Sequence, residues 1–363
     1  MIVHVFVANW NHLSPSVSKG FITTYKSDAE HYYILYGEQN YDKDQYIRLY
    51  SELNFTNYIF CQSYSKFLRV IFKLRNNAIL FHFGRYHWFL GAMMVGCRNL
   101  NWVCWGSGAK TKGTIKSQLM APLKSFIYQR FNSIVTLMEP DRLSIIKDFN
   151  VSPERVRTIP YNGSSQDETP KDLLCRDLSH LQNHSGKPVI LLGNNPTCIS
   201  SYLHVLHLLQ PYKGKIKVQC LLNYNLNKDD RYENLIKIGK SIFANDFQCN
   251  EDFHEGYTNY VNYMNTCDIY ICAVEKQTGL GAITTCLKLG KKVYITGKNL
   301  DWINSQFHAN VFDVNLINES MSFEEFIKPL TDDAKNYNYN CFIKYKSEWR
   351  DKWKSYLKEL DNF

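Results

Sequence analysis

The residues best suited to chemistry form a short glycine-containing loop at positions 275–281, with the sequence EKQTGLG. A hydrophobic run at 268–274 precedes it and predicts a buried strand, and an apolar stretch at 282–289 follows it and predicts a helix. Gly279 and Gly281 let a ligand approach the backbone closely, and the free N–H groups of a first helical turn attract anions. The loop therefore predicts a phosphate site, such as one for the diphosphate of a nucleotide, although an ordinary tight turn fits the same pattern.

Two features separate this loop from an NAD-binding fingerprint. The third glycine of the dinucleotide motif is replaced by Thr284. The loop also lies late in a chain of 363 residues, which is long enough for two domains. We therefore expect a nucleotide site in the C-terminal half.

Strands and helices alternate along both halves of the chain, which predicts an α/β protein with mainly parallel sheets. In the first half we expect a helix at 58–74 and strands at 2–8, 32–36, 78–83, 102–105, 134–137 and 156–159. In the second half we expect strands at 188–192, 216–222, 268–274 and 292–296. Two Rossmann-like domains in series, followed by C-terminal helices, describe the GT-B arrangement, in which the loops after the strands converge on a central cleft.

The domain boundaries follow from changes in composition. We expect a Rossmann-like domain at 1–163, a polar linker at 164–187, a nucleotide-binding Rossmann-like domain at 188–322 and a helical tail at 323–363. In the tail, Trp349, Trp353 and Tyr356 repeat on one helical face, which predicts that this face packs against another part of the chain.

Charge is distributed unevenly. Residues 53–138 hold eleven Lys and Arg and no Asp or Glu. The positive charge of this segment is larger than the net charge of the whole chain, which is +8, so the rest of the chain is slightly acidic. This asymmetry predicts an anionic partner for the N-terminal half. The segment at 106–130 mixes basic and large apolar residues, as in helices that bind an anionic bilayer surface, although its apolar side fits a protein core equally. Its basic residues are Lys110, Lys112, Lys116, Lys124 and Arg130.

Other features narrow the class of protein. The eleven cysteines show no Cys-x-x-Cys pair and no zinc spacing, so we expect reduced core thiols and no metal site. The first ten residues resemble a strand more than a signal peptide, and no run of 18 apolar residues predicts a membrane-spanning helix.

The chain resembles a bacterial enzyme family, the TDP-N-acetylfucosamine:lipid II N-acetylfucosaminyltransferases of glycosyltransferase family 56. The matching residues occur in family order over residues 1–320. They are Val3-His4-Val5, Phe81-His82, Trp105-Gly106, Pro122-Leu123, Leu192-Gly193-Asn194, Tyr224, Tyr232, Cys267-Asp268, Gln277 and Gly279-x-Gly281. The family carries an acidic residue shortly after the Trp-Gly pair, whereas residues 105–110 of this chain read WGSGAK. This departure implies a difference in chemistry or in the sugar.

The resemblance implies an inverting, metal-independent transfer of a 4-acetamido-4,6-dideoxyhexose from a TDP-sugar to an undecaprenyl-diphosphate-linked glycan. Such transfers build bacterial surface polysaccharides, including enterobacterial common antigen and O-antigen. The implied partners are the nucleotide-sugar donor, the lipid-linked acceptor and the anionic surface of the inner membrane. The implied location is peripheral, at the cytoplasmic face of that membrane, and no cofactor is expected.

Given this resemblance, the positions of the loops that follow the predicted strands suggest roles for individual residues. For the donor we expect the N–H groups of residues 278–281 to hold the diphosphate, Gly193, Asn194 and Asn195 to face them, and Glu275, Gln277 and Tyr224 to contact the sugar, ribose or base. An inverting transfer needs a general base for the acceptor hydroxyl. The candidate bases are His82, Glu139, Asp141 and His12, and a purely structural role is the alternative for each.

Three other functions fit the same residues. The first is a GT-B enzyme that uses a UDP- or GDP-linked sugar for capsule or O-antigen synthesis. The second is a nucleic-acid-binding protein, but the sequence contains no basic helix-turn-helix and no RNA-type aromatic motif, so we expect no nucleic-acid partner. The third is a catalytically silent nucleotide- or anion-binding module, which the missing acidic residue favours.

Overall fold

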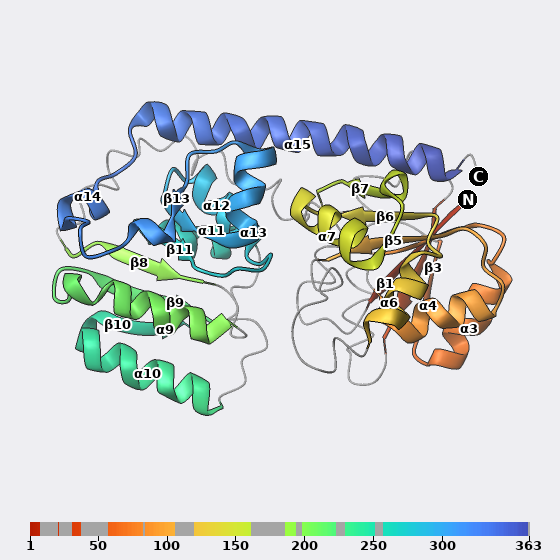
Figure 1. Ribbon diagram of the computed structural model, residues 1–363, viewed down its shortest axis with the longest axis horizontal. Helices are drawn as coiled ribbons and strands as arrows, with labels where there is room; N and C mark the ends of the chain where they lie inside the picture. The colour runs from red at the N-terminus through yellow and green to blue at the C-terminus, as the bar shows by residue number, and fades with distance from the viewer. Residues whose placement is uncertain are drawn as a thin grey trace. The chain divides into compact units, whose positions relative to one another are not determined.

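A computed structural model describes residues 1–7, 21, 31–37, 57–82, 84–105, 120–160, 186–193, 198–222, 229–250 and 257–361. The chain divides into two compact units. Unit 1 comprises Met1–Ser164 and Lys346–Phe363, and unit 2 comprises Ser165–Tyr345. Each unit is built on a parallel sheet that is accompanied by helices (Figure 1), which confirms the α/β class predicted from the sequence.

The sheet of unit 1 has seven strands in the order β3-β2-β1-β4-β5-β6-β7, and every neighbouring pair is parallel. The strands are β1 (Ile2–Val7), β2 (His31–Tyr36), β3 (Tyr58–Cys61), β4 (Ala78–Phe81), β5 (Leu100–Cys104), β6 (Ser133–Thr136) and β7 (Val156–Thr158). The chain first builds outward from β1 to β3 and then in the opposite direction from β4 to β7. The strand order therefore reverses between β1 and β4.

One predicted element of unit 1 is wrong. The sequence predicts a single helix at 58–74, but the structure has the strand β3 followed by α3 (Tyr64–Lys73). The aromatic and β-branched residues at 58–61 favour an extended backbone. Ser63 then starts the helix as its N-cap, because its side chain accepts a hydrogen bond from the Lys66 N–H.

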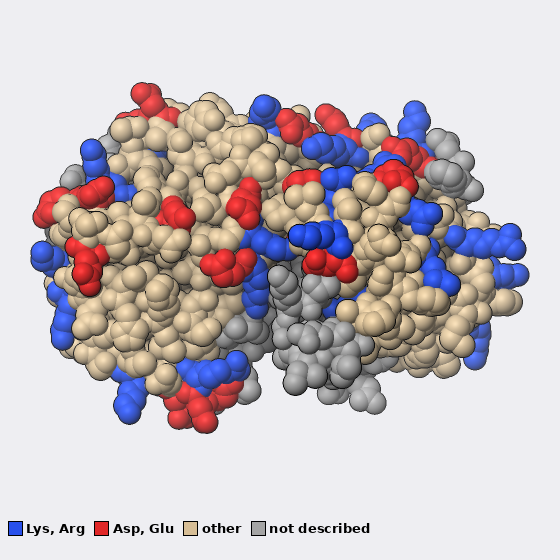
Figure 2. Space-filling model, in the orientation of Figure 1, with Lys and Arg blue, Asp and Glu red and all other residues tan. Residues whose placement is uncertain are grey.

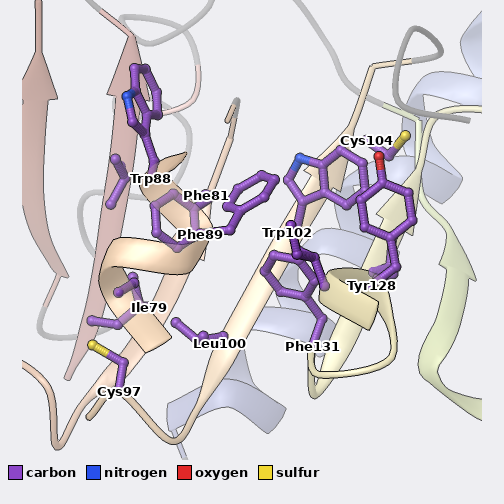
Figure 3. Packing of buried hydrophobic residues seen from close by; sticks show 14 of the residues in the cluster. Ile79, Phe81, Trp88, Phe89, Cys97, Leu100, Trp102, Cys104, Tyr128 and Phe131 are labelled. Carbon is purple, nitrogen blue, oxygen red and sulfur yellow. The ribbon is translucent and has the colours of Figure 1, made fainter. Parts of the chain in front are cut away.

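Helices α3, α4 (Tyr86–Met94), α6 (Ala121–Tyr128) and α7 (Glu139–Phe149) pack on one face of this sheet. Aromatic rings fill the layer between these helices and the sheet, as Figure 3 shows. The Phe89 ring of α4 lies with its centroid 5.1 Å from Phe81, 5.4 Å from Trp102 and 5.0 Å from Phe131. These tilted and edge-on contacts bury large apolar areas, which fixes α4 over β4 and β5.

The sheet of unit 2 has six parallel strands in the order β10-β9-β8-β11-β12-β13. Its strands are β8 (Val189–Leu192), β9 (Lys217–Leu221), β10 (Phe247–Asn250), β11 (Ile269–Cys272), β12 (Lys292–Ile295) and β13 (Phe312–Asp313). Its helices include α9 (Ile199–Leu208), α10 (Asp230–Phe243), α11 (Tyr257–Asn265), α12 (Leu280–Lys288), α13 (Gly297–Trp302) and α14 (Phe323–Ile327). In this sheet the strand order reverses between β8 and β11.

Helix α15 (Asp332–Asp361) contributes to both units. In unit 2 the Asn338 side chain exchanges hydrogen bonds with the Asn310 backbone, and the Trp302 indole N–H donates to the Tyr345 hydroxyl at 3.2 Å. In unit 1 the face predicted from the spacing of its aromatic residues is buried against the second face of the sheet, and the Trp353 indole N–H donates to the Pro160 carbonyl at 2.7 Å. Among the described helices, none is long and apolar enough to cross a bilayer.

Three buried histidines form a hydrogen-bonded row across the centre of the unit 1 sheet. His4 lies in β1, with Nδ1 2.8 Å from His82 Nε2 and Nε2 2.6 Å from His31 Nδ1. The rings of Phe6, Phe21 and Trp353 surround His82. A neutral imidazole has one donor and one acceptor nitrogen, so His4 donates to one neighbour and accepts from the other, and the two hydrogen bonds point in the same direction along the row.

This row predicts a loss of stability in acid. Burial, and secondarily the neighbouring histidines, lower the pKa values of His4 and His82 well below the ordinary 6.5. Because the unfolded chain then binds more protons than the folded chain, stability is fully present above pH 6.5 and falls as the pH drops below it. Each ring contributes up to about 1.4 kcal/mol per pH unit to this slope.

The slope is measured by urea unfolding of the whole protein between about pH 7.5 and pH 5. Tryptophan fluorescence reports mainly on unit 1, because six of the seven tryptophans belong to it and only Trp302 belongs to unit 2. Replacing both rings, as in His4→Phe with His82→Phe, is expected to flatten the pH dependence even where it lowers stability. The exposed His204 of unit 2 provides the control, and His204→Gln should leave the slope of unit 1 unchanged. A wild-type slope that survives the double replacement would contradict the prediction.

Candidate functional site

The predicted phosphate loop joins β11 to α12, so the strand, loop and helix expected from the sequence are present. Gly279 is the N-cap of α12 and has the left-handed backbone φ of 68°, which favours glycine. The Ile283 N–H donates to the Gly279 carbonyl, so the N–H groups at the start of the helix have no partner within it. The first turn contains no acidic residue and no side-chain cap. An anion placed there would meet free donors and the positive end of the helix dipole.

The first turn of α13 holds this loop in place. The side chain of Asn299, in α13, is fully buried, and its Nδ2 donates to the Thr278 carbonyl at 2.9 Å while its Oδ1 accepts from the Thr278 N–H at 3.4 Å. The Lys298 N–H donates to the Glu275 carbonyl at 3.1 Å. Gly297 allows this approach, because a Cβ there would lie 2.5 Å from the Glu275 Cα. The loop is therefore fixed before a ligand arrives.

The site lies where the strand order of unit 2 reverses. Gly193 follows β8 directly, and its N–H donates to the Ile271 carbonyl of β11 at 2.9 Å. Its φ is 61°, and a Cβ would lie 2.2 Å from the Tyr202 ring, so only glycine fits. Ligands of open parallel sheets bind outside the carboxyl ends of the strands at such a reversal. Gly193 and the loop after β11 lie at this edge of the sheet.

The remaining predicted donor residues have different environments. Gly281 and Glu275 are exposed, and Thr278 is half-buried. Gln277 is half-buried, and its Oε1 is a buried acceptor without a hydrogen-bond partner in the described structure. Such an acceptor costs about 1–3 kcal/mol unless a ligand or water donates to it. Asn194, Asn195 and Tyr224 lie outside the described residues.

The candidate bases of unit 1 are engaged in the folded protein. His82 follows β4 at the strand reversal of that sheet, but its side chain is fully buried in the histidine row. Glu139 accepts from Arg142 Nη1 at 2.7 Å and from the Thr158 hydroxyl at 2.6 Å. Asp141 is buried in the first turn of α7, and His12 lies outside the described residues. The general-base role of each stays a prediction.

One of the predicted membrane-facing residues, Lys124, needs a correction. The Lys124 side chain is buried, with Nζ 5.7 Å from the centre of the Tyr86 ring and 6.0 Å from that of Phe149. This face of α6 therefore packs into the protein, and Lys124 does not reach a bilayer surface. Arg130 is exposed, with its guanidinium 3.5 Å from the centre of the Phe126 ring. Lys110, Lys112 and Lys116 lie outside the described residues.

Sequence reasoning missed Asn299 and Gly297, which support the phosphate loop. Both follow the strand β12 at the same edge as the loop after β11. A glycine and an asparagine directly after a buried parallel strand were the available signal.

Comparison with known proteins supports the fold. No family model and no curated protein sequence matches the chain. Its structure is similar to that of Anabaena HepE solved with UDP-glucose, with a TM-score of 0.69 and 10% identity over 98% of this chain and 99% of HepE. A Rickettsia africae glycosyltransferase gives a TM-score of 0.60 and 13% identity over 97% of both chains. The N-terminal domain of Candida albicans trehalose-6-phosphate phosphatase gives a TM-score of 0.67 and 8% identity. The match covers 99% of this chain and 96% of that domain.

These similarities define the class of fold. The chain has the GT-B fold, in which two Rossmann-like units follow one another, as the sequence predicted. The predicted cleft between the two units stays a prediction.

We expect Asn299→Ala to weaken both the stability of unit 2 and its binding of a nucleoside diphosphate. The variant leaves the backbone of Thr278 without its buried partners, which costs about 1–3 kcal/mol, and it releases the loop that precedes α12. Stability is measured by urea unfolding, and binding by isothermal titration with UDP and with TDP.

Asn338→Ala is the matched control. Asn338 is as deeply buried as Asn299 and bonds the backbone of Asn310 in the same two-sided way, but it lies on α15. This control should lose similar stability and keep nucleotide affinity. Equal affinity losses in both variants would show that Asn299 acts only through general stability.

Proposed function

We propose that the chain is a glycosyltransferase whose unit 2 binds a nucleoside diphosphate sugar. The observation that carries the proposal is the uncapped, acid-free N-terminus of α12, entered through Gly279 and located where the sheet order reverses. A diphosphate suits this position because it brings negative charge to free N–H donors. HepE, which has the same fold, was solved with UDP-glucose.

In the proposed transfer, this site stabilises the diphosphate as it leaves the sugar. As the bond from sugar to diphosphate breaks, negative charge grows on the leaving phosphate. Fixed N–H groups at the helix N-terminus stabilise that charge more than the charge of the bound donor, which lowers the barrier. The Gln277 Oε1, a buried acceptor, supplies a hydrogen-bond partner for a ribose or sugar hydroxyl.

For the substrates, we propose the set implied by the sequence resemblance. The donor is a TDP-linked deoxy-amino sugar of the 4-acetamido-4,6-dideoxyhexose type, and the acceptor is an undecaprenyl-diphosphate-linked glycan at the cytoplasmic face of the bacterial inner membrane. The transfer is inverting and needs no metal. A UDP- or GDP-linked sugar is the alternative donor, and the UDP-glucose of HepE supports the UDP form.

A second candidate is a nucleotide-binding module without catalysis. It is favoured by the environments of the described candidate bases, since His82 is fully buried and both oxygens of Glu139 accept hydrogen bonds. The sequence after Trp105 also lacks the acidic residue of the resembling family. This candidate shares the donor site and differs only in the absence of transfer.

We expect Gly279→Asp to abolish nucleotide binding and Gly279→Asn to preserve most of it. Asparagine and aspartate have nearly the same size and both tolerate the left-handed backbone, so the two variants should fold alike. Only aspartate places a negative charge where the diphosphate should lie. Melting temperatures are measured for each protein with TDP, UDP, GDP, CDP and NAD.

Selective stabilisation by one nucleoside diphosphate identifies the donor class, and a ligand at 100 times its Kd adds about 2.7 kcal/mol. Equal binding by the aspartate and asparagine variants would place the diphosphate elsewhere. If none of the nucleotides stabilises the wild type, the donor proposal is wrong. Release of nucleoside diphosphate from the matching sugar nucleotide, dependent on a lipid-linked acceptor, then separates the transferase from the silent module.

A further inference from the structure

Three neighbouring helices of unit 1 end in the same pair of residue types. Each of α3, α4 and α6 carries an exposed apolar side chain near its last turn and an arginine three or four residues later. The pairs are Phe72 with Arg75, Met94 with Arg98, and Phe126 with Arg130. Helix α3 contacts α4, and α4 contacts α6. Each of the three helices leads into the next strand of the parallel sheet, so their C-terminal ends lie at the same edge of the unit. We call the six residues the arginine–apolar surface.

The apolar members are unusually exposed for their size. The side chain of Met94 is 86% exposed, that of Phe72 is 50% exposed and that of Phe126 is 47% exposed. Removing such a side chain from water is favourable. A row of large apolar side chains, rimmed by charge, is typical of a surface that binds a partner.

Helix capping explains only part of this pattern. Arg75 Nη1 donates to the Phe72 carbonyl at 2.8 Å, and Arg130 Nη1 donates to the Phe126 carbonyl at 3.2 Å. These bonds satisfy carbonyl groups near the helix ends and complement the helix dipole. They do not require an aromatic ring at 72 or 126, but each guanidinium also lies over its ring, 4.2 Å from the centre of Phe72 and 3.5 Å from that of Phe126. Neither contact accounts for the exposure of Met94.

The charge around the surface is of one sign. No Asp or Glu occurs anywhere in residues 53–138, and Lys66, Arg69 and Lys73 are further exposed cations on α3. Over α3 and α4, at the right-hand end of Figure 2, Lys and Arg gather without Asp or Glu. On the neighbouring helix α7 and the turn after it, Lys147 and Asp148, then Glu154 and Arg155, balance each other. The positive surface therefore ends at α7.

We propose that the arginine–apolar surface docks unit 1 onto an anionic phospholipid bilayer. Each cation near such a bilayer is attracted by its negative surface potential, and the exposed methionine and phenylalanine side chains enter the boundary between headgroups and acyl chains. Nucleic acid is a poorer match, since phosphate binding needs the cations but leaves Met94 in water. The assignment rests on the proposed function for its lipid-linked acceptor. It places the membrane contact at three described helix ends, one of which, with Phe126 and Arg130, belongs to the segment predicted at 106–130.

The direction of the three helices determines at which edge of the sheet the proposed membrane contact lies. The three helices run from the carboxyl edge of the sheet to its amino edge, so the arginine–apolar surface lies at the amino edge. A strand of four to six residues separates the two edges by about 13–20 Å at 3.3 Å per residue. An acceptor that binds at the carboxyl edge therefore needs a glycan between its lipid diphosphate and its reacting hydroxyl.

The experiment measures co-sedimentation of the full chain with vesicles. One set of vesicles contains phosphatidylcholine and phosphatidylglycerol, and the other contains phosphatidylcholine alone. We expect binding to the anionic vesicles that falls with added salt. Met94→Ser should lower the binding constant at least about threefold, and the triple replacement Phe72→Ser, Met94→Ser and Phe126→Ser at least about tenfold.

Matched controls come from the adjacent helix. Leu143 of α7 is 57% exposed, so Leu143→Ser removes a comparable apolar side chain beside the balanced charges. Lys147→Gln is the charge control for Arg98→Gln, which should lower anionic vesicle binding about threefold or more. Both α7 variants should bind vesicles like the wild type. The melting-temperature shift with nucleotide should persist in Met94→Ser, so the vesicle result and the donor result can fail separately.

Several outcomes overturn the proposal. These are absence of wild-type binding to anionic vesicles, equal binding to both vesicle types, equal losses in Met94→Ser and Leu143→Ser, or unchanged binding in the triple variant and in Arg98→Gln. Retention of the wild type on duplex DNA or RNA, without retention on vesicles, would assign the same surface to nucleic acid instead.

Discussion

The proposed donor site depends on the parallel pairing of β8 with β11. Parallel strands bring their carboxyl ends to one edge, and the reversal of order between these two leaves room there that crossover helices do not cover. The Gly193 N–H bond to Ile271 extends this pairing one residue beyond β8. The free donors of α12 are useful only because this pairing aims the following loop at the same edge.

Rigidity of the loop comes from a buried amide rather than from the loop itself. A segment with Gly279 and Gly281 gains ligand access but loses more conformational entropy when it is ordered. The two hydrogen bonds between Asn299 and Thr278 offset part of that cost in the free protein. Ordering the loop before binding leaves more of the interaction energy for the diphosphate. The buried histidine row orders the corresponding strand reversal of unit 1 by a similar use of side-chain hydrogen bonds.

Patterns of neighbouring residues in the sequence predicted local features of the structure. Features that depend on contacts between distant residues could not be predicted in this way. The loop at 275–281 was found because a strand, two glycines and a helix are contiguous in the chain. Asn299 was missed because its partner lies 21 residues away. Lys124 was misplaced because an amphipathic pattern does not say which helical face is the core. The burial of His82 depends in part on Phe21 and on Trp353 of α15, and neither is visible from the residues around position 82.

The direction of the helices links the two surfaces that this protein offers to anions. Where a helix begins, at the carboxyl edge, its free N–H groups attract a small anion directly, as at α12. Where it ends, at the amino edge, its free carbonyl groups attract arginines, as at α3 and α6. A row of such ends accumulates positive charge, and in unit 1 no acidic residue between positions 53 and 138 cancels it. The same helix dipoles thus favour a phosphate at one edge and, through their arginines, an extended anionic surface at the other. Exposed Met94 then distinguishes a bilayer, which solvates apolar side chains, from a soluble polyanion, which does not.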